Sequence, residues 1–178
     1  PTLRRPYREC DQWRPGAIAK LKAEHPRLIV LGMSREYGKH IDYNSNFDTY
    51  DSTWNTKLTE MVKELRGTGA EVLVLGPVPN PQGWVPNCLA LHLSDAMACS
   101  PARSKAVNQK GITAETAATR AGGGQYADIT DLFCTQERCP AIVGDTLVYR
   151  DYSHVTVRYT LQVAPVIGAL ADLALAGG

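Results

Sequence analysis

Three short apolar runs along the chain predict the strands of a sheet. Two of them, Arg27 to Gly32 and Glu71 to Gly76, are almost continuously apolar, and a third run, Gln125 to Thr130, is weaker. Strands that are buried on both faces of a parallel sheet have this composition, whereas half-exposed strands alternate apolar and polar residues. The pattern therefore predicts a narrow parallel sheet of three strands.

Apolar residues recur at helical spacing in three other stretches, and an Ala-rich region from Pro101 to Ala121 predicts a further, broken helix. Because strands and helices alternate, the predicted fold is α/β, a three-layer α/β/α sandwich with a parallel, flavodoxin-like sheet. The length of 178 residues suits a single domain, 1–178. The helical stripes are Trp13, Ala17, Ile18 and Leu21 within Trp13 to Glu24; Trp54, Leu58, Met61, Val62 and Leu65; and Val155, Tyr159, Val163, Val166, Ile167 and Leu170.

Function is expected in the loops that leave the carboxyl ends of the strands. In an open parallel sheet, ligands bind beyond those ends. The loops Met33 to Asn46 and Pro77 to Pro86 and the segment before the last helix should therefore converge on one site.

The charge balance gives no reason to expect nucleic acid or an anionic membrane surface as a partner, because 19 basic residues face 18 acidic ones. The most apolar stretch, Val163 to Ala174, contains Pro165 and Asp172 and is shorter than the roughly 20 residues of a membrane-spanning helix. No transmembrane segment or signal peptide is expected within the chain. A targeting or anchoring element could lie upstream of it.

The chain has five cysteines, and their pairing indicates whether the protein resides in an oxidising or a reducing compartment. Cys88 with Cys99 and Cys134 with Cys139 would each close a short loop rich in turn or polar residues, which predicts two disulfides and an oxidising compartment. The alternative is five reduced, buried thiols in a cytosolic protein. Cys10 is left over and lacks a partner. No metal site is expected, because no Cys-x-x-Cys pair occurs and the four His residues are scattered.

An Asp-x-x-His motif, Asp151 to His154, precedes the last predicted helix. In a turn, this spacing brings the carboxylate to one ring nitrogen of the imidazole, while the other nitrogen can take a proton from a hydroxyl. Two members of a catalytic triad are therefore expected here. In the alternative interpretation, Asp151 or Ser153 only caps the helix and His154 is a packed or solvated residue of its first turn.

Five landmarks follow one another along the chain: Tyr7 to Arg14, Leu28 to Arg35, Val74 to Pro81 followed by Cys88, Asp128 to Asp131 followed by Cys134 and Cys139-Pro140, and Tyr149 to Thr156. Their order, over nearly the whole chain, resembles the SGNH domain fused to bacterial acyltransferase-3 membrane proteins. The resemblance implies the SGNH hydrolase fold of GDSL-type esterases and a place outside the cytoplasmic membrane. It also implies O-acylation of envelope glycans or glycolipids, with Asp151 and His154 in the triad.

The nucleophile of that family is missing from this chain. The family has its serine in a Gly-Asp-Ser motif after the first strand, whereas the only Gly-Asp here, Gly144-Asp145, is followed by Thr146. We therefore expect the domain to be N-terminally incomplete, with the serine, and a partner for Cys10, on an upstream segment. The missing strand should lie beside Leu28 to Gly32, which predicts an unpaired, hydrophobic sheet edge.

The oxyanion-binding Asn of the family is also absent, because the corresponding position reads Gly32-Met33-Ser34-Arg35. The Gly32 backbone, the Ser34 hydroxyl and the Arg35 guanidinium remain candidate donors to an oxyanion, although Ser34 and Arg35 can equally begin a polar loop. Ser34 follows a strand and could also be considered as a substitute nucleophile. It is a poor candidate, because it lacks the Gly-x-Ser-x-Gly setting that exposes a serine on a tight turn.

Trp84, which lies beside Asn80 in the Pro-rich loop, is a candidate for an acceptor or sugar site. The sequence thus predicts extracytoplasmic acyl transfer, of an acetyl group by preference, through a serine acyl-enzyme. The expected partners are an acyl donor, a glycan or glycolipid acceptor and a covalently attached acyltransferase-3 membrane domain upstream, which tethers the chain to the cytoplasmic membrane. No cofactor is implied. The first alternative is an inactive SGNH-derived module that binds glycan or a neighbouring domain, and the second is a cytosolic flavodoxin-like domain.

Overall fold

The computed structural model describes residues 8–33 and 52–177 of the chain. Its main sheet is parallel, with the strand order β1-β2-β3. Strand β1 spans Leu28–Gly32, β2 spans Glu71–Leu75 and β3 spans Gln125–Ala127. The third strand is shorter than the predicted run, because the Asp128 side chain accepts the backbone N–H of Thr130 at 2.9 Å and turns the chain into the 3-10 helix η2, Thr130–Leu132.

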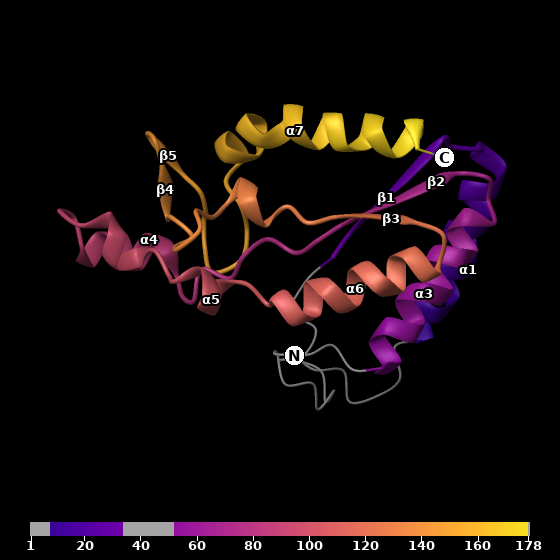
Figure 1. Ribbon diagram of the computed structural model, residues 1–178, viewed down its shortest axis with the longest axis horizontal. Coiled ribbons are helices and arrows are strands. Elements are labelled where there is room, and N and C mark those ends of the chain that lie inside the picture. Colours follow the sequence, from indigo (N-terminus) through magenta and orange to yellow (C-terminus); the bar gives the residue numbers. More distant parts are fainter. Residues whose placement is uncertain (1–7, 34–51, 178) are drawn as a thin grey trace.

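Helices cover both faces of this sheet, which confirms the predicted α/β/α sandwich (Figure 1). Three helices lie on one face: α1 (Arg8–Glu24), α3 (Ser52–Arg66) and α6 (Gln109–Ala121). Helix α7 (Val157–Ala176) covers the other face. The two faces of β2 are divided accordingly, since Val72 and Val74 pack with α1, α3 and α6, and Leu73 packs with Ala174 of α7.

The predicted break in the Ala-rich region is real, because a short helix α5 (Arg103–Ala106) precedes α6. The Asn108 side chain caps α6 by accepting the N–H of Gly111 at 2.9 Å. After α6, the three glycines let the chain pass close to α3: a Cβ at Gly122 or Gly124 would meet Val62 at 2.6 or 2.7 Å. Side chains at these two positions are therefore excluded.

Helix α1 differs from its prediction. It begins at Arg8 rather than at Trp13, with Pro15 inside it. Trp13 was assigned to the packed face, but its side chain is 69% exposed, and Ile18 is the one buried residue of this helix. The apolar spacing correctly predicted a helix. It did not predict which side is buried, because no described element packs against the side of α1 that carries Trp13.

Helix α7 is the predicted covering helix, and its inner residues Tyr159, Val163, Ile167 and Leu170 pack on the core. Val166, predicted on the same stripe, lies outside. The helix extends beyond the apolar stretch Val163 to Ala174. It has 20 residues and, among the described helices, is the one long and apolar enough to cross a membrane, by length and composition alone. Exposed apolar side chains line its outer face: Val157, Leu161, Val166 and Leu173.

A second apolar core lies beyond the carboxyl ends of the strands. It joins helix α4 (Val85–Leu91), the 3-10 helix η1 (Ala96–Cys99), strand β5 (Thr146–Leu147) and the start of α7. Strand β4 (Ile142–Val143), which pairs with β5 in a hairpin, is exposed. Both predicted disulfides lie in this part of the chain and are confirmed, Cys88–Cys99 and Cys134–Cys139. This core supports the loops in which the sequence places the chemistry.

Candidate active site

The motif that precedes α7 forms a tight turn around the carboxylate of Asp151. Its Oδ2 lies 2.7 Å from Nδ1 of His154. Its Oδ1 accepts two backbone N–H groups, from Ser153 at 2.8 Å and from His154 at 2.7 Å. The Asp-x-x-His spacing thus works locally, because the turn that the carboxylate caps also brings the imidazole back onto it.

The two side chains differ in exposure. The Asp151 side chain is 13% exposed and the His154 side chain is 68% exposed. The backbone N–H of His154 is the main cause that lowers the pKa of Asp151 from its ordinary 3.8 to about 2, with desolvation acting in the opposite direction. Asp151 is therefore ionised throughout the neutral range, and the imidazole faces solvent.

This geometry can support general base catalysis by His154. A carboxylate accepts only, so the contact with Oδ2 favours the tautomer that carries its proton on Nδ1. That tautomer leaves Nε2 as the basic nitrogen, and the same carboxylate stabilises the imidazolium once Nε2 takes a proton. The hydroxyl of Ser153 lies 3.5 Å from Nδ1, the nitrogen that Asp151 already holds, so Ser153 is not placed as a nucleophile.

A small backbone frame fixes the turn. Tyr149 and Val155 form an antiparallel bridge, and the N–H of Arg150 donates to the carbonyl of His154 at 2.9 Å. Thr156 then caps α7, since its hydroxyl accepts the N–H of Tyr159 at 3.2 Å. The Asp151–His154 pair therefore lies in a loop that the bridge closes, directly before the start of α7.

The Pro-rich loop reaches the same turn, as predicted. The buried hydroxyl of Tyr149 donates to the carbonyl of Pro79 at 2.9 Å. Asn80, a substrate candidate, has a structural bond instead, because its Oδ1 accepts the N–H of Gln82 at 2.8 Å. The amide nitrogen of Asn80 is therefore the part of this side chain that could still bind a substrate.

Trp84 is the substrate candidate with a described side-chain contact to the Asp151–His154 turn. Its ring centroid is 5.8 Å from that of Tyr152, and the two ring planes are inclined by 48°. Sequence reasoning missed Tyr152, and no periodicity marks it. Its place between Asp151 and His154 was the one signal that could have drawn attention to it.

The oxyanion candidates are only partly placed. Gly32 is the last residue of β1, exposed, in register with Leu75 of β2. It lies at the carboxyl edge where the site was expected, without a described contact to His154. Ser34, Arg35 and nearly all of the loop Met33 to Asn46 lie outside the described residues.

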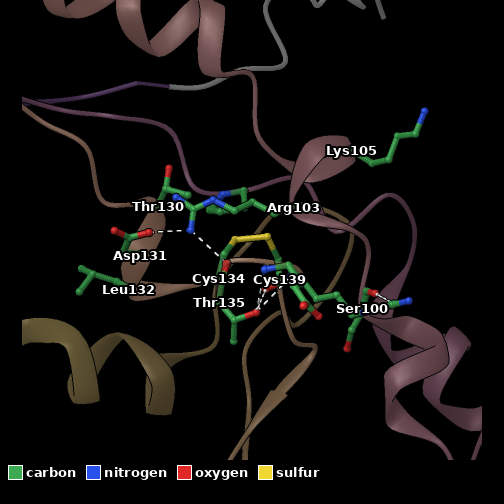
Figure 2. Close-up of a disulfide and its surroundings, with 12 residues drawn as sticks. Ser100, Arg103, Lys105, Thr130, Asp131, Leu132, Cys134, Thr135 and Cys139 are labelled. Carbon is green, nitrogen blue, oxygen red and sulfur yellow. Dashed lines mark hydrogen bonds and ion pairs between the residues drawn. A yellow bond between two sulfur atoms is a disulfide. The ribbon is translucent and has the colours of Figure 1, made fainter.

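The disulfide Cys134–Cys139 closes the neighbouring loop on itself, and Arg103 of α5 binds to this loop (Figure 2). The Arg103 guanidinium donates to Asp131 at 2.6 Å and to the carbonyl of Thr135 at 3.0 Å. Cys10 is a free thiol in α1. Within residues 8–33 and 52–177, no group of three His, Cys, Asp or Glu side chains is arranged to hold a metal ion.

The fold and the Asp–His turn together define an α/β domain of the hydrolase-like class. The family model described as "SGNH domain (fused to AT3 domains)" matches residues 1–169. The chain therefore belongs to this SGNH-domain family, which confirms the resemblance seen in the sequence.

One solved structure supports the fold. The periplasmic domain of the lipopolysaccharide acetyltransferase of Salmonella ser. Paratyphi A is similar with a TM-score of 0.63 and 16% sequence identity. The match covers 86% of this chain and 61% of that one, so this chain spans less than two thirds of its structural neighbour. Among curated proteins, no match is found.

Proposed function

We propose that this chain supplies Asp151 and His154 to a serine-dependent acyl transfer site outside the cytoplasmic membrane. The transferred group is an acyl group, acetyl by preference, and the acceptor is a hydroxyl of an envelope glycan or glycolipid. The observation that carries this proposal is the 2.7 Å contact between Asp151 Oδ2 and His154 Nδ1 in a turn before the last helix. Membership of a family fused to AT3 domains, and likeness to a periplasmic lipopolysaccharide acetyltransferase domain, support it.

The reaction proceeds in two half-reactions. Nε2 of His154 takes the proton of a serine hydroxyl, whose oxygen attacks the acyl carbonyl of the donor, and the imidazolium returns the proton to the leaving group. In the second half, Nε2 takes the proton of the acceptor hydroxyl, whose oxygen attacks the carbonyl of the acyl-enzyme. The bond between this carbonyl and the serine oxygen breaks, and the imidazolium returns the proton to that oxygen. Asp151 stabilises the imidazolium in both halves. The Gly32 N–H, Ser34 and Arg35 are the donors proposed for the oxyanion.

The serine lies, in this proposal, on polypeptide outside this chain. The sequence contains no Gly-Asp-Ser, and the outer edge of β1 pairs with no described strand. Val30, in the middle of β1, is 47% exposed although it is apolar. An added strand that carries the serine at its carboxyl end would cover this edge, and the free thiol of Cys10 would be available to the same segment.

An inactive binding module is the second candidate function. The sequence lacks both the serine and the oxyanion Asn of its family, and an exposed pair of aromatic rings lies at the proposed site. This module would bind glycan through those rings without transferring an acyl group.

Fluorophosphonate labelling with peptide-level mass spectrometry separates the two functions. It is run on this chain and on the chain extended by its natural upstream sequence, each with and without His154→Ala. Acyl transfer predicts labelling of one serine in the extended protein alone, and loss of the label with His154→Ala. An extended protein that takes no label on any serine contradicts acyl transfer and leaves the binding module.

A further inference from the structure

Two aromatic side chains from distant parts of the sequence stand together beside the catalytic turn. Trp84 is 52% exposed and Tyr152 is 46% exposed, although both rings are large and apolar. Their centroids are 5.8 Å apart and their planes are inclined by 48°, so the rings contact one another at an angle. The contact covers part of each ring, and about half of each side chain remains open to solvent.

The backbone on both sides of Tyr152 is fixed. Asp151, immediately before it, accepts the N–H groups of the two residues that follow, Ser153 and His154. The residue pair Tyr149 and Val155 closes the turn behind it. Tyr152 therefore lies in a fixed turn, directly after the carboxylate of Asp151 and two residues before the proposed base His154.

The loop that carries Trp84 is held by several independent bonds. The backbone N–H of Asn80 donates to the carbonyl of Ala106 at 2.8 Å, and its side chain accepts the N–H of Gln82. Gln82 has a φ of 64° and ties its own amide to the carbonyl of Lys105 at 2.9 Å. A non-glycine residue adopts such a positive φ at a cost in free energy, and it persists because these bonds determine the loop.

Trp84 itself is the N-cap of α4, which the Cys88–Cys99 disulfide fixes to η1. About half of the Trp84 side chain is buried and contributes to the folding free energy, whereas the exposed half does not. The strained turn and the disulfide thus hold a ring whose open half is left for a ligand.

We propose that Trp84 and Tyr152 form a carbohydrate-binding platform that positions the acceptor sugar at His154. The ligand class is a pyranose ring, whose apolar C–H face rests on the open indole and phenol faces. Gln82 and Ser153 are neighbours of the two rings in the sequence, and the Gln82 Oε1 and the Ser153 hydroxyl are the polar groups proposed to bond the hydroxyls of the sugar. This inference rests on the proposed function for its catalytic consequence, and not for binding itself.

The open form of the platform favours a sugar over the acyl chain of the donor. An acyl chain is apolar on every side and gains most from an enclosed groove, whereas a sugar ring has one apolar face and a polar rim. Two rings that are half exposed and inclined to each other match the second case. Binding of an acyl chain is the alternative that the experiment must separate.

Binding is tested by NMR of the natural protein with ¹⁵N-labelled indole groups. The Trp84 signal is assigned with Trp84→Phe, and the protein is titrated with chitotetraose, with maltotetraose and with octanoate. We expect at least one tetrasaccharide at millimolar concentration to shift the Trp84 signal, and octanoate not to do so. Tyr152→Ala should weaken the interaction by about tenfold, as expected when one apolar ring face is removed from a contact, whereas Tyr152→Phe should retain it.

Trp13→Phe is the matched control, because Trp13 is an exposed indole on α1, far along the chain from the turn. It should leave the sugar titration as it is. A Trp84 signal that moves with neither sugar, or with octanoate alone, overturns the platform.

If the platform positions the acceptor, its loss should let water compete with the sugar for the acyl group. With a soluble glycan acceptor, Trp84→Ala should raise the acceptor KM and lower the ratio of transfer to hydrolysis by about tenfold. A Trp84→Ala protein with an unchanged ratio and unchanged KM contradicts the positioning role. Sugar binding in a protein whose serine takes no fluorophosphonate label would leave the platform in place and refute acyl transfer.

Discussion

At the scale of single residues, the site depends on one carboxylate with three N–H partners. Asp151 accepts the backbone groups of Ser153 and His154 as well as the imidazole. Its role is therefore double, since it builds the turn and favours the tautomer of His154 that carries its proton on Nδ1. A substitution that keeps the shape but changes the charge separates these roles.

Asp151→Asn is expected to lower the rate of acyl transfer by about 10⁴-fold, because an amide can present its N–H to Nδ1 and favour the wrong tautomer. The rate of glycan acylation by the extended protein measures this loss. Asp145→Asn is a matched control, because Asp145 is an exposed carboxylate that pairs with Arg158 at 2.6 Å without touching His154. An equal loss of acylation rate in both variants would mean that the rate depends on the negative charge of this region and not on the contact of Asp151 with His154.

The pH at which the turn opens follows from the lowered pKa of Asp151. A carboxyl group with a depressed folded-state pKa contributes stability above its unfolded pKa and loses it as the pH falls through the folded value. The turn should therefore weaken between the ordinary pKa of 3.8 and about 2. The side-chain carboxyl ¹³C shift of Asp151 should titrate near 2, and a midpoint at the ordinary value would contradict the hydrogen-bonded turn.

Glu115 is the buried acid that the proposed chemistry does not use. It lies in α6 and accepts the Tyr126 hydroxyl at 2.9 Å, and burial raises its pKa above 4.5 while bonds from Tyr126 and Trp54 oppose this. A raised folded-state pKa means that stability is fully present below the unfolded pKa and declines as the pH rises through the folded value.

Glu115→Gln should therefore gain stability relative to the wild type as the pH rises from acidic to neutral. Glu115→Ala should instead lose about 1 to 3 kcal/mol, because it removes the acceptor of the partly buried Tyr126 hydroxyl. Urea unfolding at both pH values measures the differences. A Gln variant that is less stable at neutral pH than at acidic pH, relative to the wild type, would contradict the raised pKa.

At the scale of elements, the two disulfides stabilise the part of the chain that carries the site. Their sequence separations are 11 and 5 residues, so loop-closure entropy assigns about 3 kcal/mol to Cys88–Cys99 and about 2 kcal/mol to Cys134–Cys139. Replacing each pair by Ser should lower the free energy of unfolding by these amounts, as measured by urea unfolding. The loss of Cys88–Cys99 should also broaden the Trp84 indole signal, whereas the loss of Cys134–Cys139 should not, since only the first pair anchors α4.

The elements also show what the sequence can predict. The periodic pattern of α3 identified the residues that are buried, Leu58, Val62 and Leu65, because one face of that helix packs fully on the sheet. The same reasoning failed at Trp13 of α1, since a pattern identifies apolar residues and does not say what covers them. The inner face of α7 was predicted and its exposed outer face was not, for the same reason.

The candidate site also contains one contact that the sequence predicted and one that it did not. The Asp151–His154 pair was predictable because its geometry is local and a spacing of three residues encodes it. The contact of Trp84 with Tyr152 joins residues far apart in the sequence, and it depends on how the Pro-rich loop is tied to Tyr149. No local pattern encodes a contact of this kind.

At the scale of the whole molecule, one edge of the main sheet has no described strand beside it. β1 lies at the edge of the main sheet (Figure 1), with Val30 half exposed, and Trp13 is exposed on α1. An edge strand without charges or Pro is a template for another strand, and folded proteins cover such edges. Leu28–Gly32 contains neither. The edge is therefore the expected place for the strand that brings the serine.

Hydrogen exchange tests this arrangement directly. In this chain alone, alternate amides of β1 that point away from β2 should exchange rapidly, because no strand within residues 8–33 and 52–177 pairs with that edge. In the chain extended by its natural upstream sequence, the same amides of Leu28–Gly32 should become protected, together with a rise in the free energy of unfolding. The amides of β2 serve as the internal control, since β1 and β3 already cover both of its edges. If β1 exchanges equally fast in both proteins, the serine does not arrive on a strand beside β1, and the triad must be completed from another direction.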